Sequence, residues 1–171
     1  MVGSVSFYQE CRILEFDIDV CALSQKFYTD YPEATYPELM RKDGRPYTCL
    51  IIDSRDGYFI CIPFRSNIQH KEAFLFTGTN RSKKSPSGLD YKKTVLITNG
   101  DYIDSAKAVV DADEYNMVMQ NTEKIASEIN DYIADYTDHI TGVKTLHERE
   151  FNRRFRYSTL SYFHDILGLE T

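Results

Sequence analysis

One short stretch of the chain concentrates side chains that bind phosphate and move protons. Residues 65–71 read Arg-Ser-Asn-Ile-Gln-His-Lys, so two cations, a hydroxyl, an amide and an imidazole fall within seven positions. They follow directly on an apolar run, Tyr58 to Phe64, that is typical of a strand. Functional groups often lie where a strand ends and a loop begins. The stretch therefore predicts a site for a phosphate-bearing substrate.

Cleavage of an RNA phosphodiester without a metal requires three chemical roles. A base takes the proton of the attacking 2′-hydroxyl, donors neutralise the nonbridging oxygens, and an acid protonates the leaving 5′-oxygen. Arg45 and Arg65 suit the second role because guanidinium donors pair with phosphate oxygens. His70 could transfer a proton near neutral pH, and the Ser66 hydroxyl could bond the phosphate or orient the nucleophile. These four residues are the catalytic candidates.

A second group of side chains could contact the RNA around the cleaved bond. Two tyrosines could stack on bases, as single-stranded RNA recognition often requires, and the amide and cations could bond the backbone. The predicted RNA contacts are Tyr36, Tyr47, Asn67, Lys71, Arg81, Lys83, Lys84 and Lys92. The His, Cys and acidic residues show no ligand spacing, so we expect neither a metal site nor a cofactor.

The candidates also have ordinary structural interpretations, which the sequence leaves open. His70 could bond a backbone carbonyl, and Ser66-Asn67 could be turn residues. Arg45 could be a solvated charge at a strand edge. The loop of Arg81, Lys83 and Lys84 could be solvated, and the basic residues of 149–156 could pair with an acidic helix or contact RNA.

A hairpin is expected to position the central residues. The run from Arg45 to Ile52 and the run from Tyr58 to Phe64 flank a turn that ends in Asp56-Gly57, a strong hairpin signal. In an antiparallel hairpin the start of one strand lies beside the end of its partner. We therefore expect Arg45 and Ser66 to be neighbours.

The order of the other elements predicts one α+β domain over residues 1–171. Alternation and apolar runs predict strands first, and a helical period appears only in the second half, which favours a twisted, mainly antiparallel sheet covered by helices. Strands are expected over Cys11–Val20, Ala73–Phe76 and Leu89–Ile97, with a short edge at Tyr102-Ile103. Helices are expected over Ser24–Tyr31, 36–40, about 111–139, 146–155 and 160–167, with Gly142 and Gly168 as stop signals.

The net charge of −6 hides a segregation along the chain. Residues 41–93 hold eleven Lys or Arg against five Asp or Glu, a charge of +6, and the remainder holds nine against twenty-one, a charge of −12. A basic centre framed by acidic segments favours a focused anion site over nonspecific nucleic-acid binding. There is no apolar run of about eighteen residues and no signal-peptide pattern, so we expect a cytoplasmic protein with no membrane partner.

Three blocks of the sequence resemble a known family. They are Gly44-Arg45-Pro46-Tyr47, the run from Ile62 to Lys71, and Ser87-Gly88-Leu89-Asp90-Tyr91. The chain resembles the toxins of type III toxin–antitoxin systems, the ToxN/AbiQ endoribonucleases, and is most similar to their TenpN branch, from about Tyr28 to Leu169. The resemblance implies a strongly twisted antiparallel sheet related to the Kid/MazF toxins. It also implies a metal-independent endoribonuclease that leaves a 2′,3′-cyclic phosphate and a 5′-hydroxyl.

The same resemblance implies RNA partners. A small structured RNA antitoxin, cut by the toxin from a repeat transcript, would bind in the basic groove and inhibit the enzyme. Toxin–RNA pairs would form closed rings or other symmetric assemblies. Cellular or phage RNA would be the substrate, and cleavage would arrest growth or abort phage infection.

The family's site residues map onto this chain with one departure. The basic residue at the start of the Arg-Pro-Tyr strand falls on Arg45, and the hydroxyl in the following loop falls on Ser66. The lysine that better-known members carry just after this serine is absent, and Ile68 stands near its place. We therefore expect the charge role to move to Arg65 or Lys71, and the acid/base role to His70.

Two functions of other classes stay open. A noncatalytic RNA-binding regulatory protein would use the same basic groove with no proton transfer. A structural interaction domain would present the acidic helical face to a protein partner.

Overall fold

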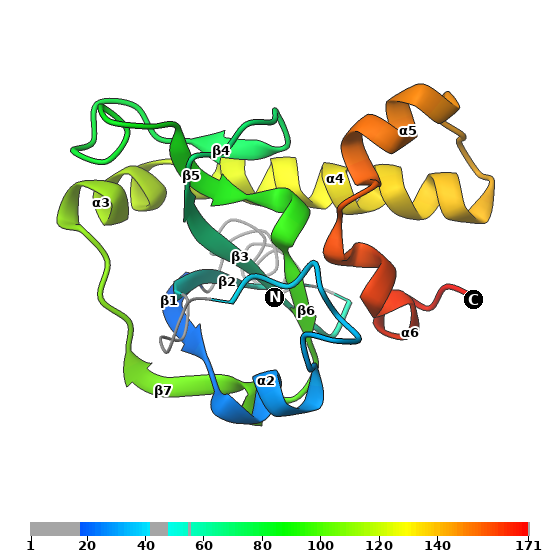
Figure 1. The fold of residues 1–171 in the computed structure, drawn as a ribbon, viewed down its shortest axis with the longest axis horizontal. Helices are drawn as coiled ribbons and strands as arrows, with labels where there is room; N and C mark the ends of the chain where they lie inside the picture. The colour runs from blue at the N-terminus through cyan, green and yellow to red at the C-terminus, as the bar shows by residue number, and fades with distance from the viewer. Residues whose placement is uncertain (1–17, 42–47, 55, 171) are drawn as a thin grey trace, which may run out of the picture.

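Seven antiparallel strands form the sheet in the part of the chain that the structure describes. The structure, a computed structural model, describes residues 18–41, 48–54 and 56–170, with the backbone alone for 48–50 and 105–107. Within these ranges the strand order is β4-β5-β3-β2-β1-β7, and β6 also pairs with β3 (Figure 1). The strands are β1 (Ile18–Leu23), β2 (Thr48–Asp53), β3 (Phe59–Ser66), β4 (Ala73–Leu75), β5 (Ser87–Asp90), β6 (Val95–Ile97) and β7 (Ile103–Lys107). The predicted α+β class with a mainly antiparallel sheet is confirmed.

Strand β3 is the centre of the sheet because three other strands pair with it. Cys61 lies opposite Ile51 of β2 on one side and opposite Val95 of β6 on the other. Further along β3 the neighbour changes from β6 to β5, so that Arg65 lies opposite Gly88. The predicted hairpin of the two central runs is confirmed, and the polar stretch begins where β3 leaves the sheet.

The helices follow the strands in the chain, with one exception near the start. Helix α2 begins after Ser24, whose hydroxyl accepts a hydrogen bond from the amide of Phe27. Gly142 and Gly168 end helices in the left-handed conformation, as predicted from their positions. The helices are α2 (Gln25–Asp30), α3 (Ala112–Gln120), α4 (Thr122–Thr141), α5 (Glu148–Phe155) and α6 (His164–Leu167), with short 3-10 turns η1 (Tyr91–Lys93), η2 (Gly100–Tyr102) and η3 (Thr159–Phe163).

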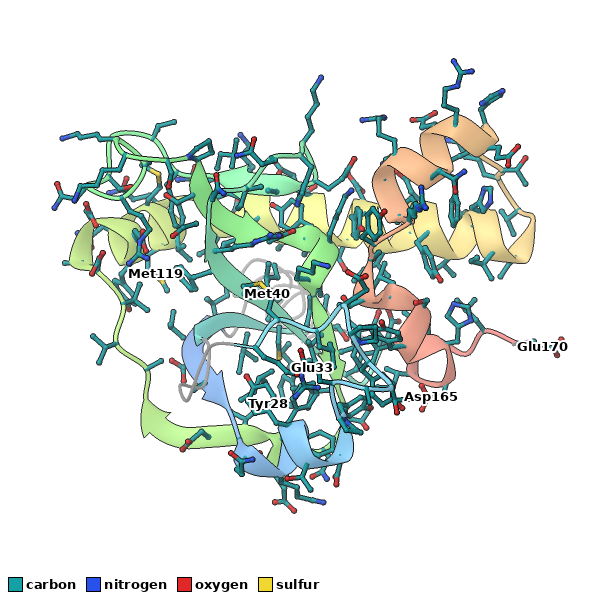
Figure 2. All side chains as sticks on the ribbon, viewed as in Figure 1. Tyr28, Glu33, Met40, Met119, Asp165 and Glu170 are labelled. Carbon is teal, nitrogen blue, oxygen red and sulfur yellow. The ribbon has the colours of Figure 1, made fainter. Side chains whose placement is uncertain are left out.

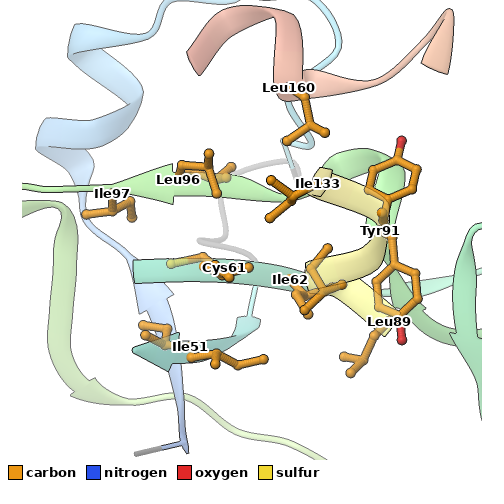
Figure 3. Close-up of a cluster of buried hydrophobic side chains, with 14 of the residues drawn as sticks. Ile51, Cys61, Ile62, Leu89, Tyr91, Leu96, Ile97, Ile133 and Leu160 are labelled. Atoms are coloured by element: carbon orange, nitrogen blue, oxygen red, sulfur yellow. The ribbon is translucent and has the colours of Figure 1, made fainter. Parts of the chain in front are cut away.

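The apolar face of α4 closes the core. Its inward side chains recur at three- and four-residue steps, which is the period that the sequence predicts. Figure 3 shows Ile133 of α4 and Leu160 of η3 close to the buried side chains of β3 and β6. The buried residues of α4 are Ile125, Ala126, Ile129, Tyr132, Ile133 and Tyr136.

The single helix expected over about 111–139 is in fact two helices. Helix α3 ends at Gln120 and α4 begins at Thr122, with Asn121 between them at φ −124° and ψ 23°. The side-chain amide of Asn121 donates to the carbonyl of Met117 at 2.7 Å. Asparagine side chains that bond the local backbone compete with regular helical bonding, which explains the break.

Three further elements differ from the expected ones. The strand predicted over Leu89–Ile97 is interrupted because the Asp90 side chain accepts from the amide of Lys92 at 3.0 Å and caps η1. Residues 36–40 form turns rather than helix. The first strand is described from Ile18 onward, and it continues past the predicted end at Val20 to Leu23. The earlier part of that predicted strand lies outside the described residues.

None of the described helices combines the length and the apolar character needed to cross a membrane.

Candidate functional site

A cavity of about 280 Å³ opens where β3 leaves the sheet. The end of β3, the loop before β5 and the segment before α3 form its walls. Three of the residues predicted to act on RNA, Arg65, Ser66 and Arg81, lie in its lining. The remaining lining residues are Met40, Phe64, Phe76, Val109, Val110, Asp111 and Glu114. The cavity therefore combines an apolar base with arginine, hydroxyl and carboxyl groups.

A buried carboxylate holds Arg65 in place. Asp90 is fully buried, and its Oδ2 lies 2.6 Å from Nη1 of Arg65. Its Oδ1 lies 3.0 Å from Nε2 of His70. Burial alone would raise the pKa of Asp90, but the hydrogen bonds from His70 and Arg65 outweigh it and hold the pKa below its ordinary value. Asp90 is therefore a carboxylate that joins the end of β3 to the loop of His70.

His70 is placed beside this carboxylate rather than in the cavity. Its two ring nitrogens are shielded from solvent, and Nε2 faces the carboxylate of Asp90. A group that exchanges protons with a substrate needs a ring nitrogen within reach of it. In this conformation the geometry fits a positioning role for His70, and its acid/base role stays a prediction.

Arg81 links three walls of the cavity. Its Nε lies 2.9 Å from Oε1 of Glu114, and its Nη2 lies 3.3 Å from Oδ2 of Asp111. Its Nη1 donates to the Ser66 hydroxyl at 3.3 Å. The loop that carries Arg81 is fixed to α3, because the amide of Asn80 donates to Asp113 at 2.8 Å. Arg81 thus faces the cavity from an ordered loop.

Glu114 is a buried acid in the same cavity. Its residue surface is only 3% exposed, although it lies in the first turn of α3. Burial raises the pKa of Glu114, and the nearby Asp111 and Asp113 add to this rise, while Arg81 opposes it. A carboxyl group with a raised pKa beside arginines and a hydroxyl can exchange a proton with a substrate.

The loop after β3 is shaped by two residues. Asn67 takes the left-handed conformation at φ 56°, which asparagine tolerates better than most residues, and Gln69 donates to its side chain at 2.7 Å. Ile68 is 3% exposed and its amide donates to the carbonyl of Pro86 at 2.9 Å. The residue that stands near the expected lysine is therefore an apolar anchor that holds the loop on the core.

The other predicted RNA contacts are spread over the surface. Lys71, Lys83 and Lys84 are exposed, and they form no ion pair with any described residue. Asn67 is also exposed. Such cations can contribute to the binding of a phosphate backbone.

Two predicted contacts lie away from the cavity. Lys92 is 7% exposed, burial lowers its pKa, and its ammonium donates to the carbonyl of Arg153 at 2.8 Å. Tyr36 packs against Tyr31 and Tyr162 on another part of the protein. Arg45 and Tyr47 fall outside the described residues, and so does the expected contact between Arg45 and Ser66.

The sequence interpretation missed Asp90 and Glu114. Asp90 belongs to the Ser-Gly-Leu-Asp-Tyr block, where a lone acid inside an apolar strand pattern was the available signal. Glu114 follows Asp111 and Asp113 in an acidic run typical of a helix start, so no local signal separates it from its neighbours. Only the tertiary structure buries one of these acids beside Arg81.

Comparisons of the chain with protein-family models, with curated proteins and with solved structures found no match. Within the described ranges, no three His, Cys, Asp or Glu side chains gather in a way that could hold a metal ion.

Proposed function

We propose that this protein is an endoribonuclease that cleaves single-stranded RNA by attack of the 2′-hydroxyl. The observation that carries the proposal is the cavity in which Arg65, Ser66 and Arg81 meet the buried carboxyl group of Glu114. Arginines and a hydroxyl are suited to bind a phosphate, and a carboxyl group of raised pKa is suited to move a proton. The phosphate donors and the base, two of the three roles that the reaction requires, are thus available within one cavity.

Each group has a role in this reaction. Arg65 and Arg81 donate to the nonbridging oxygens, where charge develops in the transition state, and the Ser66 hydroxyl adds a further donor. Glu114, as a carboxylate, takes the proton of the 2′-hydroxyl. The 2′-oxygen bonds to phosphorus and the bond to the 5′-oxygen breaks. The 5′-oxygen takes up a proton from water, and the proton that Glu114 accepted is released to solvent. The products are a 2′,3′-cyclic phosphate and a 5′-hydroxyl.

Binding of the phosphate requires Arg81 to exchange partners. The guanidinium now bonds Glu114, Asp111 and Ser66. A phosphate that displaces Glu114 from Arg81 frees the carboxylate to act as the base. Substrate binding and activation of the base are coupled in this way.

The biological setting follows from the sequence resemblance. The protein is proposed to be the toxin of a type III toxin–antitoxin system that acts in the cytoplasm on cellular or phage RNA. A processed structured RNA is proposed as its inhibitor, bound in part by the exposed side chains of Lys71, Lys83 and Lys84. Binding there would exclude substrate from Arg65 and Arg81.

The proposal is tested with purified protein and a long single-stranded RNA in the presence of EDTA. We expect cleavage, with fragments that carry 5′-hydroxyl and 2′,3′-cyclic phosphate ends, because the cavity supplies the donors and the base. Kinase labelling without prior phosphatase treatment identifies the 5′-hydroxyl ends. Fragments with 5′-phosphate ends would contradict the mechanism, and intact RNA would contradict the activity.

The second candidate is a noncatalytic RNA-binding protein. It is favoured by one observation, the shielding of both ring nitrogens of His70, which leaves the sequence-predicted acid/base group out of reach of a ligand. This function requires the arginines but no proton transfer. RNA binding that persists at all pH values without any cleavage would support it.

A further inference from the structure

A second and larger cavity, of about 590 Å³, lies between the end of α2 and the C-terminal helices. It shares no lining residue with the cavity beside β3. In Figure 2, side chains crowd the space between α2 and the segment that carries Asp165. The lining residues are Asp30, Tyr31, Tyr36, Tyr102, Ser161, Tyr162, His164 and Asp165.

Four tyrosines give the cavity aromatic walls. The rings of Tyr31 and Tyr36 are 4.9 Å apart between centroids and tilted by 60°. The ring of Tyr162 stands at 89° to that of Tyr36, 5.1 Å away, and the ring of Tyr102 stands at 76° to that of Tyr31. The cavity is open to solvent, and the four rings line it in several orientations. Faces of aromatic rings attract cations, and the Lys26 ammonium already lies 5.7 Å from the centroid of the Tyr102 ring.

The charge of the lining is negative. Asp30 accepts hydrogen bonds from Lys26 and from the Tyr102 hydroxyl, each at 2.8 Å. The Asp165 side chain has no ion pair or hydrogen bond with any described residue. Among the residues that the structure describes, the lining holds no lysine or arginine. One carboxylate at this cavity is therefore available to a bound cation.

Two further groups of the lining are the Tyr31 phenol and the His164 ring. Burial raises the pKa of Tyr31 to about 12, and Tyr102, Asp165, Tyr36 and Asp30 contribute to the rise, so its phenol stays a neutral donor. His164 is engaged by the Tyr136 hydroxyl, which lies 2.6 Å from its Nε2. The Tyr31 phenol therefore adds no charge to the cavity wall, and one ring nitrogen of His164 is already in contact with the Tyr136 hydroxyl.

We propose that this cavity binds a small organic cation, an aliphatic amine or guanidine, with its charged head at Asp165 and its chain on the tyrosine rings. Aromatic faces and a carboxylate together form the usual environment of such ligands in proteins. The carboxylates would repel the phosphates of a bound nucleotide, which disfavours the predicted stacking of Tyr36 on an RNA base. The proposal does not depend on RNA cleavage.

Tyrosine fluorescence measures this binding directly, because the chain has thirteen Tyr and no Trp. We expect agmatine and putrescine to change the emission in a saturable way, and the uncharged analogue butanediol to have no effect. Isothermal titration calorimetry with the same ligands gives the affinities. Adenosine is the contrasting probe: binding of adenosine without binding of the amines would overturn the proposal.

A matched pair of variants places the binding at this cavity. Asp165→Asn removes the unpaired carboxylate and should weaken agmatine binding about three- to fivefold, the range of an exposed charge pair. Glu170→Gln removes an exposed acid from the same C-terminal segment but outside the lining, and should leave the affinity unchanged. Circular dichroism checks that both variants fold. Equal affinities for all three proteins, or no saturable response to either amine, would refute the proposal.

Discussion

Asp90 is the residue on which the geometry beside β3 depends. It is fully buried and contacts Arg65 at 2.6 Å and His70 at 3.0 Å, and it also caps η1. A buried carboxylate is stable only when its partners compensate for the lost hydration. Removal of the carboxylate would leave Arg65 without its anchor, so the position of this arginine in the cavity follows from Asp90.

Asp90→Asn is expected to lower the free energy of unfolding at pH 7 by about 3–5 kcal/mol, because it breaks a buried charge interaction. The pKa of Asp90 lies below its ordinary value of 3.8 in the folded state. Its contribution is therefore present above that ordinary value and is lost as the pH falls through the lower, folded-state pKa. Urea unfolding at pH 7 and at acid pH should show the difference between wild type and variant shrinking in acid.

Asp131→Asn is the matched control, since Asp131 is exposed on α4 and forms no ion pair with a described residue. It should change the free energy of unfolding by less than about 0.5 kcal/mol. An equal loss in both variants, or a difference that grows as the pH falls, would contradict the role assigned to Asp90.

Residue types at the cavity were partly predictable from the sequence. Arg65 and Ser66 were chosen for their chemistry and their place after a strand, and the structure puts both in the cavity lining. Glu114 could not be chosen, because three acids in one helical turn look alike until the fold buries one of them. Lys92 shows the opposite outcome. It was predicted from the sequence to contact RNA, whereas the structure buries its side chain.

At the scale of elements, β4 and β5 approach each other closely at Gly88. Gly88 lies opposite Leu75 of β4 and Arg65 of β3. A β-carbon on Gly88 would overlap the carbonyl oxygen of Phe74 and come within 2.9 Å of the Leu75 Cα. A side chain at this position would force the two strands apart, which gives a packing reason for glycine there.

Gly88→Ala is expected to reduce the free energy of unfolding by about 3 kcal/mol, at the upper end for overpacking, because the clash is with backbone. Gly100→Ala is the control, since a β-carbon there meets no atom within 4 Å and its φ is not positive. Urea unfolding compares the two variants. If Gly88→Ala were as stable as Gly100→Ala, the close approach of β4 and β5 would not be a constraint on the fold.

Secondary-structure elements were predicted correctly where the signal in the local sequence was strong. The central hairpin and the stops at Gly142 and Gly168 were predicted because each depends on residues close in sequence. The division between α3 and α4 was missed because the helical period runs through Asn121 without interruption. The 3-10 turn η1 was missed because it depends on the side chain of Asp90.

At the scale of the whole molecule, ion pairs connect α5 both to α4 and to the segment beside the central loop. Arg154 of the basic α5 lies 2.9 Å from Asp135 of the acidic α4 and 3.0 Å from Glu72 beside the central loop. The sequence left open whether the basic residues of 149–156 pair with an acidic helix or contact RNA. For Arg154 the structure shows an ion pair with the acidic helix α4. Lys71, Lys83 and Lys84 are exposed and form no ion pair with a described residue. Their charges can therefore attract an anion to the protein surface.

The cleavage rate of cavity variants on one RNA tests the central claim most directly. Ser66→Ala and Glu114→Gln are expected to slow single-turnover cleavage by about 100-fold or more, the usual effect of a lost donor or base. Ser127→Ala and Glu123→Gln, exposed positions on α4, are the matched controls and should cleave at the wild-type rate. Cleavage by all four variants at the wild-type rate would show that the cavity beside β3 is not the site of the reaction.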